Sequence, residues 1–257
     1  MRSGVRLRRP LPSVVVLAAA VLPHPPLLVP ALTAGGAPLV APLLAACGSV
    51  VAGLLGHAPG TVVLIGSGEH TAVRPAQAAV ALAGFGAAVP EAASAPEVVG
   101  PGEAVLPLSL AIGRWLLDRA GWTGDVLLQE IAADTPAADC ERLGRALAAE
   151  TGPDTVWVAL GDGSNRRGPR SPGHDDPRAE GFDASVTAAF ARADPAALLG
   201  LDADLAAELG AAGRAVWQVL AAAVAGDPGW ARIDAAVHYD DAPFGVQYLV
   251  ADWRPRS

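Results

Sequence analysis

Short apolar runs alternate along the chain with longer stretches in which apolar residues recur every three to four positions. The short runs, rich in Val, Leu and Ile and bounded by Gly, Pro or charge, predict buried strands, and the longer Ala/Leu-rich stretches predict helices. We expect strands at residues 14–22, 61–65, 125–131, 155–160, 233–238 and 246–253. We expect helices at residues 38–55, 76–83, 106–120, 137–149, 178–192, 194–209 and 211–225, with loops at 86–104 and 161–177.

Strands that alternate with helices are typical of βαβ units, in which a mostly parallel sheet carries helices on both faces. The last two predicted strands are joined by residues 239–245, a connection too short for a crossover, so they predict an antiparallel hairpin. The pattern therefore predicts a three-layer α/β sandwich with a C-terminal β-hairpin. We find no linker rich in Pro, Gly or Ser that would divide the chain, so we expect a flexible basic tail at 1–12 and a single domain at 13–257.

The composition indicates a folded, acidic protein. The chain has 257 residues, 52% of them hydrophobic, and a formal net charge of -8. These values exclude a disordered chain, and the acidic balance argues against nucleic acid as a partner. All 18 basic residues are Arg, and the chain contains a single Asn, Asn165. The two cysteines, Cys47 and Cys140, lie in apolar stretches and are interpreted as buried residues rather than as a disulfide framework.

The N-terminal segment imitates a secretory signal, because four arginines precede the first apolar run: Arg2, Arg6, Arg8 and Arg9. The run is too short to span a bilayer, is rich in Val and leads directly into a Pro-rich loop, so a buried strand is favoured. The later Ala-rich stretches are interrupted by Gly, Pro or charge. We therefore expect a cytoplasmic protein without a membrane partner.

Polar and titratable residues follow several of the predicted strands: His24, Glu69, His70, Asp162, Asn165, Asp240 and Asp241. Ligands of open α/β sheets bind outside the carboxyl ends of the strands, so these side chains mark the predicted site. Two histidines and one carboxylate on separate loops can form the facial triad that holds non-haem Fe(II). From the residues alone, a structural role for His24 or His70 is an equal alternative.

The remaining histidines favour other interpretations. His57 lies at a helix end, where a cation meets the negative end of the helix dipole, so it is interpreted as structural. His238 lies within an apolar strand and is interpreted as a core residue or as a neighbour of the site residues. The sequence His174-Asp175-Asp176 superficially resembles the paired ligands of metal phosphohydrolases, and a metal-dependent hydrolase is a more distant alternative.

Three segments resemble the class III extradiol ring-cleavage dioxygenases of the catalytic B-subunit (LigB) type, a superfamily that also includes the Memo-type proteins. They are VLPHPPLLVP at 21–30, GDGSNR at 161–166 with SPG, DPR and FD at 171–173, 176–178 and 182–183, and YDDAPFG at 239–245. Their order and spacing match over most of the chain, from about residue 14 to residue 253. The opening Pro-His-Pro-Pro and the closing Pro-Phe-Gly are more specific together than either is alone.

The resemblance implies a role for each matching position. His24 and His70 match the two iron-binding histidines, and Asp241 matches the carboxylate ligand, with Asp240 as its alternative. Glu69, Asp162 and Asp240 would surround the metal ligands or contact substrate.

The sequence departs from the family at two positions. Asn165 stands where the family has its acid/base histidine, and an amide cannot shuttle a proton near neutral pH. His174, nine residues further on, could take that role. The carboxylate is Asp where the family usually has Glu.

Two functions therefore remain open. The first is an Fe(II)-dependent extradiol-type dioxygenase that cleaves a small aromatic diol with O₂. The second is a non-catalytic, Memo-like protein that binds a metal or a small molecule. Zn or no metal at all is an alternative to Fe(II), and the resemblance allows a homodimer.

Overall fold

The computed structural model describes residues 16–32, 37–82, 104–225 and 227–256. The predicted tail at 1–12, the start of the first predicted strand and nearly all of the predicted loop at 86–104 lie outside these residues. The strands are β1 (Val16–Leu22), β2 (Thr61–Gly68), β3 (Ala72–Arg74), β4 (Asp125–Ala132), β5 (Thr155–Leu160), β6 (Ile233–Asp241) and β7 (Tyr248–Pro255). The helices are α1 (Ala37–Leu55), α2 (Leu108–Arg119), α3 (Ala137–Thr151), α4 (Arg178–Ala191), α5 (Pro195–Leu199), α6 (Ala203–Glu208) and α7 (Arg214–Ala225).

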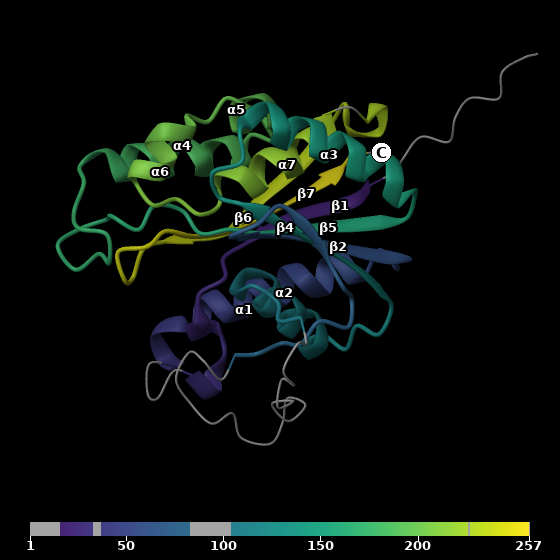
Figure 1. The fold of residues 1–257 in the computed structure, drawn as a ribbon, viewed down its shortest axis with the longest axis horizontal. Helices are drawn as coiled ribbons and strands as arrows, with labels where there is room; N and C mark the ends of the chain where they lie inside the picture. Colours follow the sequence, from purple (N-terminus) through teal and green to yellow (C-terminus); the bar gives the residue numbers. More distant parts are fainter. Residues whose placement is uncertain (1–15, 33–36, 83–103, 226, 257) are drawn as a thin grey trace, which may run out of the picture.

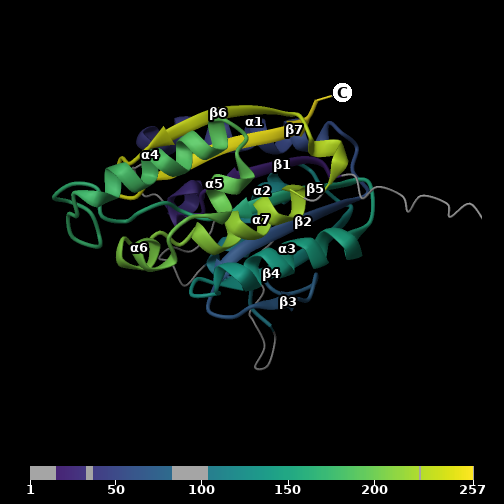
Figure 2. The same ribbon diagram turned by 90° about the horizontal axis from the view of Figure 1, so that it is seen from above.

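The strands form one seven-stranded sheet in the order β3-β4-β2-β5-β1-β7-β6. Figure 2 displays this order, from β6 at the top to β3 at the bottom. The four inner strands β4, β2, β5 and β1 pair in parallel, whereas β3 and the hairpin β6–β7 pair antiparallel at the two sides. The predicted C-terminal hairpin is therefore confirmed.

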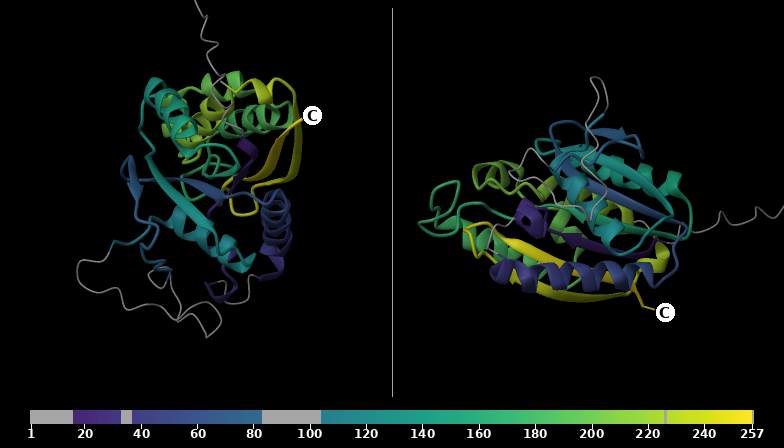
Figure 3. Two further views of the ribbon diagram at one scale, coloured as in Figure 1. Left: turned by 90° about the vertical axis from the view of Figure 1, so that its right-hand side faces the viewer. Right: turned by 90° about the horizontal axis from the view of Figure 1, so that it is seen from below.

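Helices cover both faces of the sheet, which confirms the predicted three-layer α/β architecture. Helices α3 to α7 lie above the sheet in Figure 1, and α1 and α2 lie below it. The end-on view at the left of Figure 3 shows the sheet between the two helical layers. Buried strands with apolar residues on both sides are what a parallel sheet between two helical layers requires.

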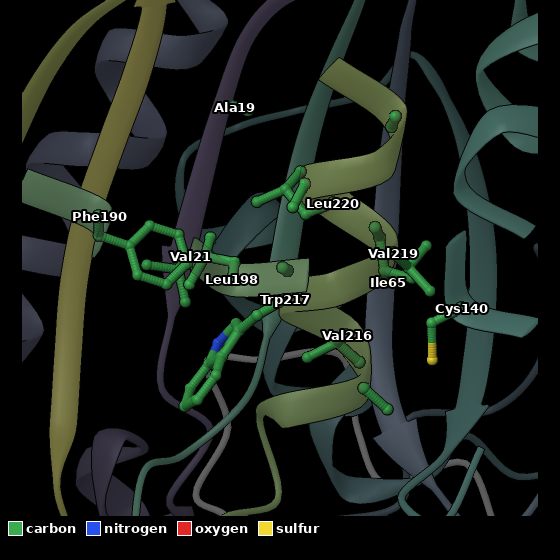
Figure 4. Close-up of a cluster of buried hydrophobic side chains, with 14 of the residues drawn as sticks. Ala19, Val21, Ile65, Cys140, Phe190, Leu198, Val216, Trp217, Val219 and Leu220 are labelled. Atoms are coloured by element: carbon green, nitrogen blue, oxygen red, sulfur yellow. The ribbon is translucent and has the colours of Figure 1, made fainter. Parts of the chain in front are cut away.

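The core beneath helices α3 to α7 is built around large aromatic side chains. Trp157, Trp217 and Trp253 are almost completely buried. Figure 4 shows Trp217 and Leu220 of α7 on the side of the helix where Val21 of β1 lies, with Phe190 of α4 beside them. The Phe190 and Trp217 rings meet edge to face, with their centroids 6.2 Å apart. This packing fixes α7 over the middle of the sheet.

Three predicted elements differ from the structure. The helix predicted at 76–83 is wrong for its described part, because Ala79 forms an extended bridge with Val105 and exchanges backbone hydrogen bonds with residues 104 and 106. The single helix predicted at 194–209 is two helices, α5 and α6: α5 ends before Gly200, and the carboxylate of Asp202 caps the first turn of α6. Strand β3 was not predicted, because three residues are too few to show a periodic pattern.

Helix α1 is long and apolar enough to cross a membrane, judged by length and composition alone. The window Pro38–Leu55 has a mean hydropathy of 2.0, and a third of it is buried. In the structure α1 packs on the sheet, with Leu43, Cys47 and Val51 in the core. Core helices of globular proteins meet the same criteria, so the helix does not decide where the protein resides.

Candidate functional site

The carboxyl ends of five strands lie at one edge of the sheet. Strands β1, β2, β4 and β5 are parallel, and β6 runs in the same direction because both it and β1 are antiparallel to β7. The loops that leave this edge lie at the left of Figure 1. The residues predicted from the strand ends therefore share this edge, which we call the carboxyl edge.

His24 and Asp162 form a close pair at the carboxyl edge. Backbone hydrogen bonding between Gly161 and Leu22 continues the β1–β5 pairing beyond the strand ends. The backbone N–H of His24 donates to Asp162 Oδ1 at 2.8 Å, and His24 Nδ1 lies 3.5 Å from the same oxygen. The two side chains are 12% and 16% exposed, and Nδ1 is buried without a hydrogen-bond partner. The pair thus offers an unsatisfied imidazole nitrogen beside a carboxylate.

The low exposure of Asp162 alters its acidity. Burial raises the pKa of Asp162 above its ordinary value, and the charge and backbone N–H of His24 oppose this shift. A raised folded-state pKa means that the ionised carboxylate costs folding stability at neutral pH. That cost disappears as the pH falls through the raised pKa.

We expect Asp162→Asn to raise the free energy of unfolding at neutral pH by about 1 kcal/mol. Stabilising substitutions commonly give gains of this size, and at binding sites they often reduce function. The amide oxygen of Asn can still accept the His24 N–H, whereas the buried charge is removed. Urea unfolding at pH 7 and near pH 4 would measure this, and the gain should be smaller at the lower pH. A loss of stability at pH 7 would show that the charge of Asp162 stabilises the fold.

Tyrosines and an apolar thiol surround this pair on the side of the sheet that α1 covers. Tyr248, which begins β7, is 4% exposed, and its pKa is raised by burial and then by the charges of Asp162 and Tyr239. Burial and the nearby Asp241 raise the pKa of Tyr239. Burial and then Asp162 raise the pKa of the Cys47 thiol to about 12, so this thiol is protonated at neutral pH and behaves as an apolar residue. The tyrosines remain protonated as well and can act as neutral hydrogen-bond groups.

The two adjacent aspartates of β6 lie on opposite faces of the sheet, because neighbouring side chains of a strand alternate. Asp240 Oδ1 accepts a hydrogen bond from Gln247 Nε2 at 2.8 Å, and the same nitrogen donates to Thr187 of α4 at 2.9 Å. Asp240 thus belongs to the α4 side. Asp241 shares a face with Tyr239, and its Oδ1 accepts the N–H of Ala242 at 2.7 Å. Of the two carboxylates, Asp241 therefore lies on the side of the sheet that carries the tyrosines.

Asn165 is held in the loop that follows β5. Its backbone N–H donates to Leu209 O at 3.0 Å, and its carbonyl accepts from Gly173 N at 2.9 Å. A Cβ added at Gly173 or Gly210 would lie 2.2 or 2.4 Å from Asn165 Oδ1, which is buried without a partner. The amide is therefore packed tightly between two glycines. His174 is exposed with a left-handed φ of 65°, and no hydrogen bond or ion pair recorded for the described residues joins it to Asn165 or His24.

A buried network that was not predicted secures the same loop. The carboxylate of Asp183 on α4 accepts hydrogen bonds from both the backbone N–H and the hydroxyl of Ser164, at 2.9 and 2.7 Å. Gln247 N donates to Ser164 O, and Gly163 N donates to Gln247 O, so the loop runs alongside the start of β7. In the sequence, Phe182 and Asp183 were identified only as part of the second of the three family segments, without a role for the carboxylate. The feature that could have indicated the role of Asp183 is its position among the apolar residues of the buried face of α4, where a carboxylate needs hydrogen-bond donors.

Glu69 and His70 form an exposed turn at the end of β2, and they do not converge with His24 and Asp241. The sheet order separates β2 from β1 by β5, and β1 from β6 by β7. With strands about 4.8 Å apart, the ends of β2 and β6 lie roughly 19 Å from each other. Within the described ranges, no group of three His, Cys, Asp or Glu side chains is placed to hold a metal ion. The side chains as placed therefore do not fit the facial triad predicted from His24, His70 and Asp241.

The other predicted titratable residues have local partners or lie at the surface. His238 Nε2 lies 2.6 Å from Asp252 Oδ1 across the hairpin, and His57 is exposed after the end of α1. In the loop after β5, Asp175 accepts the N–H of Gly168 and Asp176 pairs with Arg178. The structure thus shows both carboxylates of the alternative hydrolase motif holding their own loop.

Comparisons with known proteins give a structural likeness but no family. No family model matches the chain, and no curated protein matches it. The fold is similar to the crystal structure of an uncharacterized protein, JW3007, from Escherichia coli K12, with 15% identity and a TM-score of 0.48. The similarity covers 93% of this chain and 99% of that one.

Proposed function

We propose that this chain is a LigB-like relative of the class III extradiol dioxygenases that binds a small aromatic diol at the carboxyl edge, with chemistry altered from that of the family. The observation that supports this proposal is the His24–Asp162 pair, in which an unsatisfied imidazole nitrogen lies beside a carboxylate with a raised pKa. With Nδ1–H turned toward the carboxylate, the other ring nitrogen, Nε2, can accept a hydrogen bond from a phenolic hydroxyl. The neutral tyrosines nearby supply an aromatic, partly apolar wall of the kind that suits a ring.

The residues of the pair have distinct roles in this proposal. Asp162 holds the His24 backbone through its Oδ1 and lies within reach of the ring nitrogen, so it orients the imidazole. A diol hydroxyl that donates to His24 would transfer its proton there if it ionises, and the adjacent carboxylate would stabilise the resulting imidazolium. Asn165 can contribute a hydrogen bond but no proton transfer.

Ring cleavage with O₂ would require a bound Fe(II) that the diol chelates through both oxygens. Because His24, His70 and Asp241 are not gathered in this structure, we assign no step to a metal. Fe(II)-dependent cleavage stays the first of the two functions that the sequence motifs indicate, and the experiment below distinguishes it from binding.

Binding without turnover, as the Memo-type branch suggests, is favoured by one specific observation. The acid/base position of the family is held by Asn165, whose amide is packed against Gly173 and Gly210. An amide has no proton to exchange near neutral pH, and one packed in this way keeps its position. For either function we expect the protein to act in the cytoplasm.

The proposal is tested with protein purified anaerobically, analysed for metal content and mixed with catechol and protocatechuate with and without O₂. We expect saturable binding of a diol. A ring-fission product together with stoichiometric iron would establish the dioxygenase, and binding without product would establish the non-catalytic function. Absence of both binding and product would refute the proposal.

A further inference from the structure

Tyr248 is a nearly buried tyrosine at the start of β7 that none of the sequence motifs includes. It is 4% exposed and belongs to the same core cluster as Cys47 of α1. Within the described residues, no hydrogen bond includes its hydroxyl. Burial raises the pKa of this hydroxyl, so its proton stays in place at neutral pH. Tyr248 therefore brings a neutral hydrogen-bond donor to the side of the sheet that α1 covers.

The backbone places Tyr248 beside Asp162. Beyond the end of β1, the loop after β5 pairs directly with the start of β7: Gly163 N donates to Gln247 O, and Gln247 N donates to Ser164 O, both at 2.9 Å. A Cβ added at Gly163 would lie 2.7 Å from Gln247 Cβ, and Gln247 bonds to α4, so both positions point to the α4 side. Asp162 and Tyr248 precede and follow this contact, and successive side chains alternate between the two faces of a sheet. These two side chains therefore lie together on the α1 side.

Tyr248 has Asp241 as its neighbour on the other side. The two residues are cross-strand partners in the β6–β7 ladder, and such partners share a face, with Cβ atoms roughly 5 Å apart. Asp162, Tyr248 and Asp241 thus form a row across the carboxyl edge. His24 is joined to one end of this row, because its Nδ1 lies 3.5 Å from Asp162 Oδ1. The Tyr248 side chain therefore lies between the His24–Asp162 pair and the exposed Asp241.

A diol with adjacent hydroxyls presents two oxygens, and each of them needs a hydrogen-bond partner at the site. In the proposed function His24 accepts one hydroxyl, which leaves the second oxygen without a partner. We infer that Tyr248 is a specificity-determining residue whose hydroxyl donates to the second oxygen of an ortho-diol bound at His24. This inference rests on the proposed function, because that diol is the ligand concerned. Adjacent hydroxyls suit it because Tyr248 and His24 both neighbour Asp162.

The role of the Tyr248 hydroxyl is tested by a cycle that changes both protein and ligand. Calorimetry compares catechol with phenol, which lacks the second hydroxyl, on the wild type and Tyr248→Phe. We expect the wild type to bind catechol about tenfold more tightly than phenol, since a hydroxyl paired in the site adds about this much. Tyr248→Phe keeps the ring, so it should weaken catechol binding to the level of phenol and leave phenol binding unchanged. Ser185→Ala removes a hydroxyl from α4, on the opposite face of the sheet, and should keep the wild-type preference.

A second measurement reports on Tyr248 in the wild-type chain. Tyr239 and Tyr248 are its two tyrosines, so labelling with fluorotyrosine gives two fluorine resonances, and Tyr239→Phe identifies the one from Tyr248. We expect saturating catechol to shift the Tyr248 resonance and phenol to shift it less.

Three results would overturn the inference while the proposed function stands: equal wild-type affinities for catechol and phenol, a catechol preference that survives in Tyr248→Phe, or a Tyr248 resonance that catechol does not move. If the wild type binds no catechol, the inference and the proposed function both fail.

Discussion

Replacing Gly144 by alanine is expected to lower the free energy of unfolding by about 3 kcal/mol, at the upper end of the cost of overpacking a core. Gly144 lies on α3 at its contact with α7 and is buried. A Cβ there would lie 2.2 Å from the carbonyl oxygen of Val219 and 2.8 Å from the Cβ of Ala222. Because the first neighbour is backbone, the two helices must separate to admit a single methyl group.

Gly181→Ala is the matched control for this change. Gly181 lies in helix α4, and a Cβ there would meet nothing within 4 Å. Alanine should therefore raise stability by about 0.5–1 kcal/mol, the difference in helix propensity between the two residues. Urea unfolding of both variants measures the contrast. Equal effects at the two positions would mean that α3 and α7 are not in the close contact described.

Replacing Arg214 by methionine is expected to cost about 2–4 kcal/mol, because it leaves two buried acceptors, Thr135 O and Gln218 Oε1, without their donor. Arg214 begins α7 and is 3% exposed. Its guanidinium donates to Thr135 O at 2.5 Å, to Ala133 O at 2.6 Å and to Gln218 Oε1 at 3.1 Å. None of the ion pairs found between described residues includes it. Carbonyl and amide dipoles therefore stabilise the cation, which joins the end of β4 to α7.

The control for Arg214 is Arg145→Met. Arg145 forms an exposed ion pair with Glu141 one turn away on α3, and exposed pairs of this kind contribute about 0.5 kcal/mol or less. Chemical unfolding should show a large loss for Arg214→Met and almost none for Arg145→Met. A loss at Arg214 as small as that at Arg145 would show that methionine packs in place of the hydrogen bonds.

The sequence predicted the layers of this fold because its strands and long helices are strongly periodic. It did not predict the break between α5 and α6, which depends on the cap formed by Asp202, or the extended pairing of Ala79 with Val105, which is a long-range contact. Local patterns do not contain such information, and tertiary contacts override weak helix propensity.

The candidate site was predictable in its location but not in its geometry. Topology places His24, His70, Asp162 and Asp241 at one edge, which follows from the direction of the strands. Which of them meet depends on strand order: β5 lies beside β1, so Asp162 meets His24, whereas β2 and β6 lie far apart. Tyr248 was missed because a single tyrosine at the start of an apolar strand gives no sequence signal of the pairing that places it beside Asp162.

If His24 binds an aromatic diol at the carboxyl edge, its replacement must weaken that binding, and calorimetry with catechol on His24→Ala beside His57→Ala measures this. His57 is an exposed histidine at the end of α1, so its replacement controls for the loss of an imidazole elsewhere. We predict that His24→Ala weakens binding by about tenfold or more, the usual effect of removing a buried hydrogen-bond partner, while His57→Ala matches the wild type. Equal affinities for the wild type and both variants would contradict the claim.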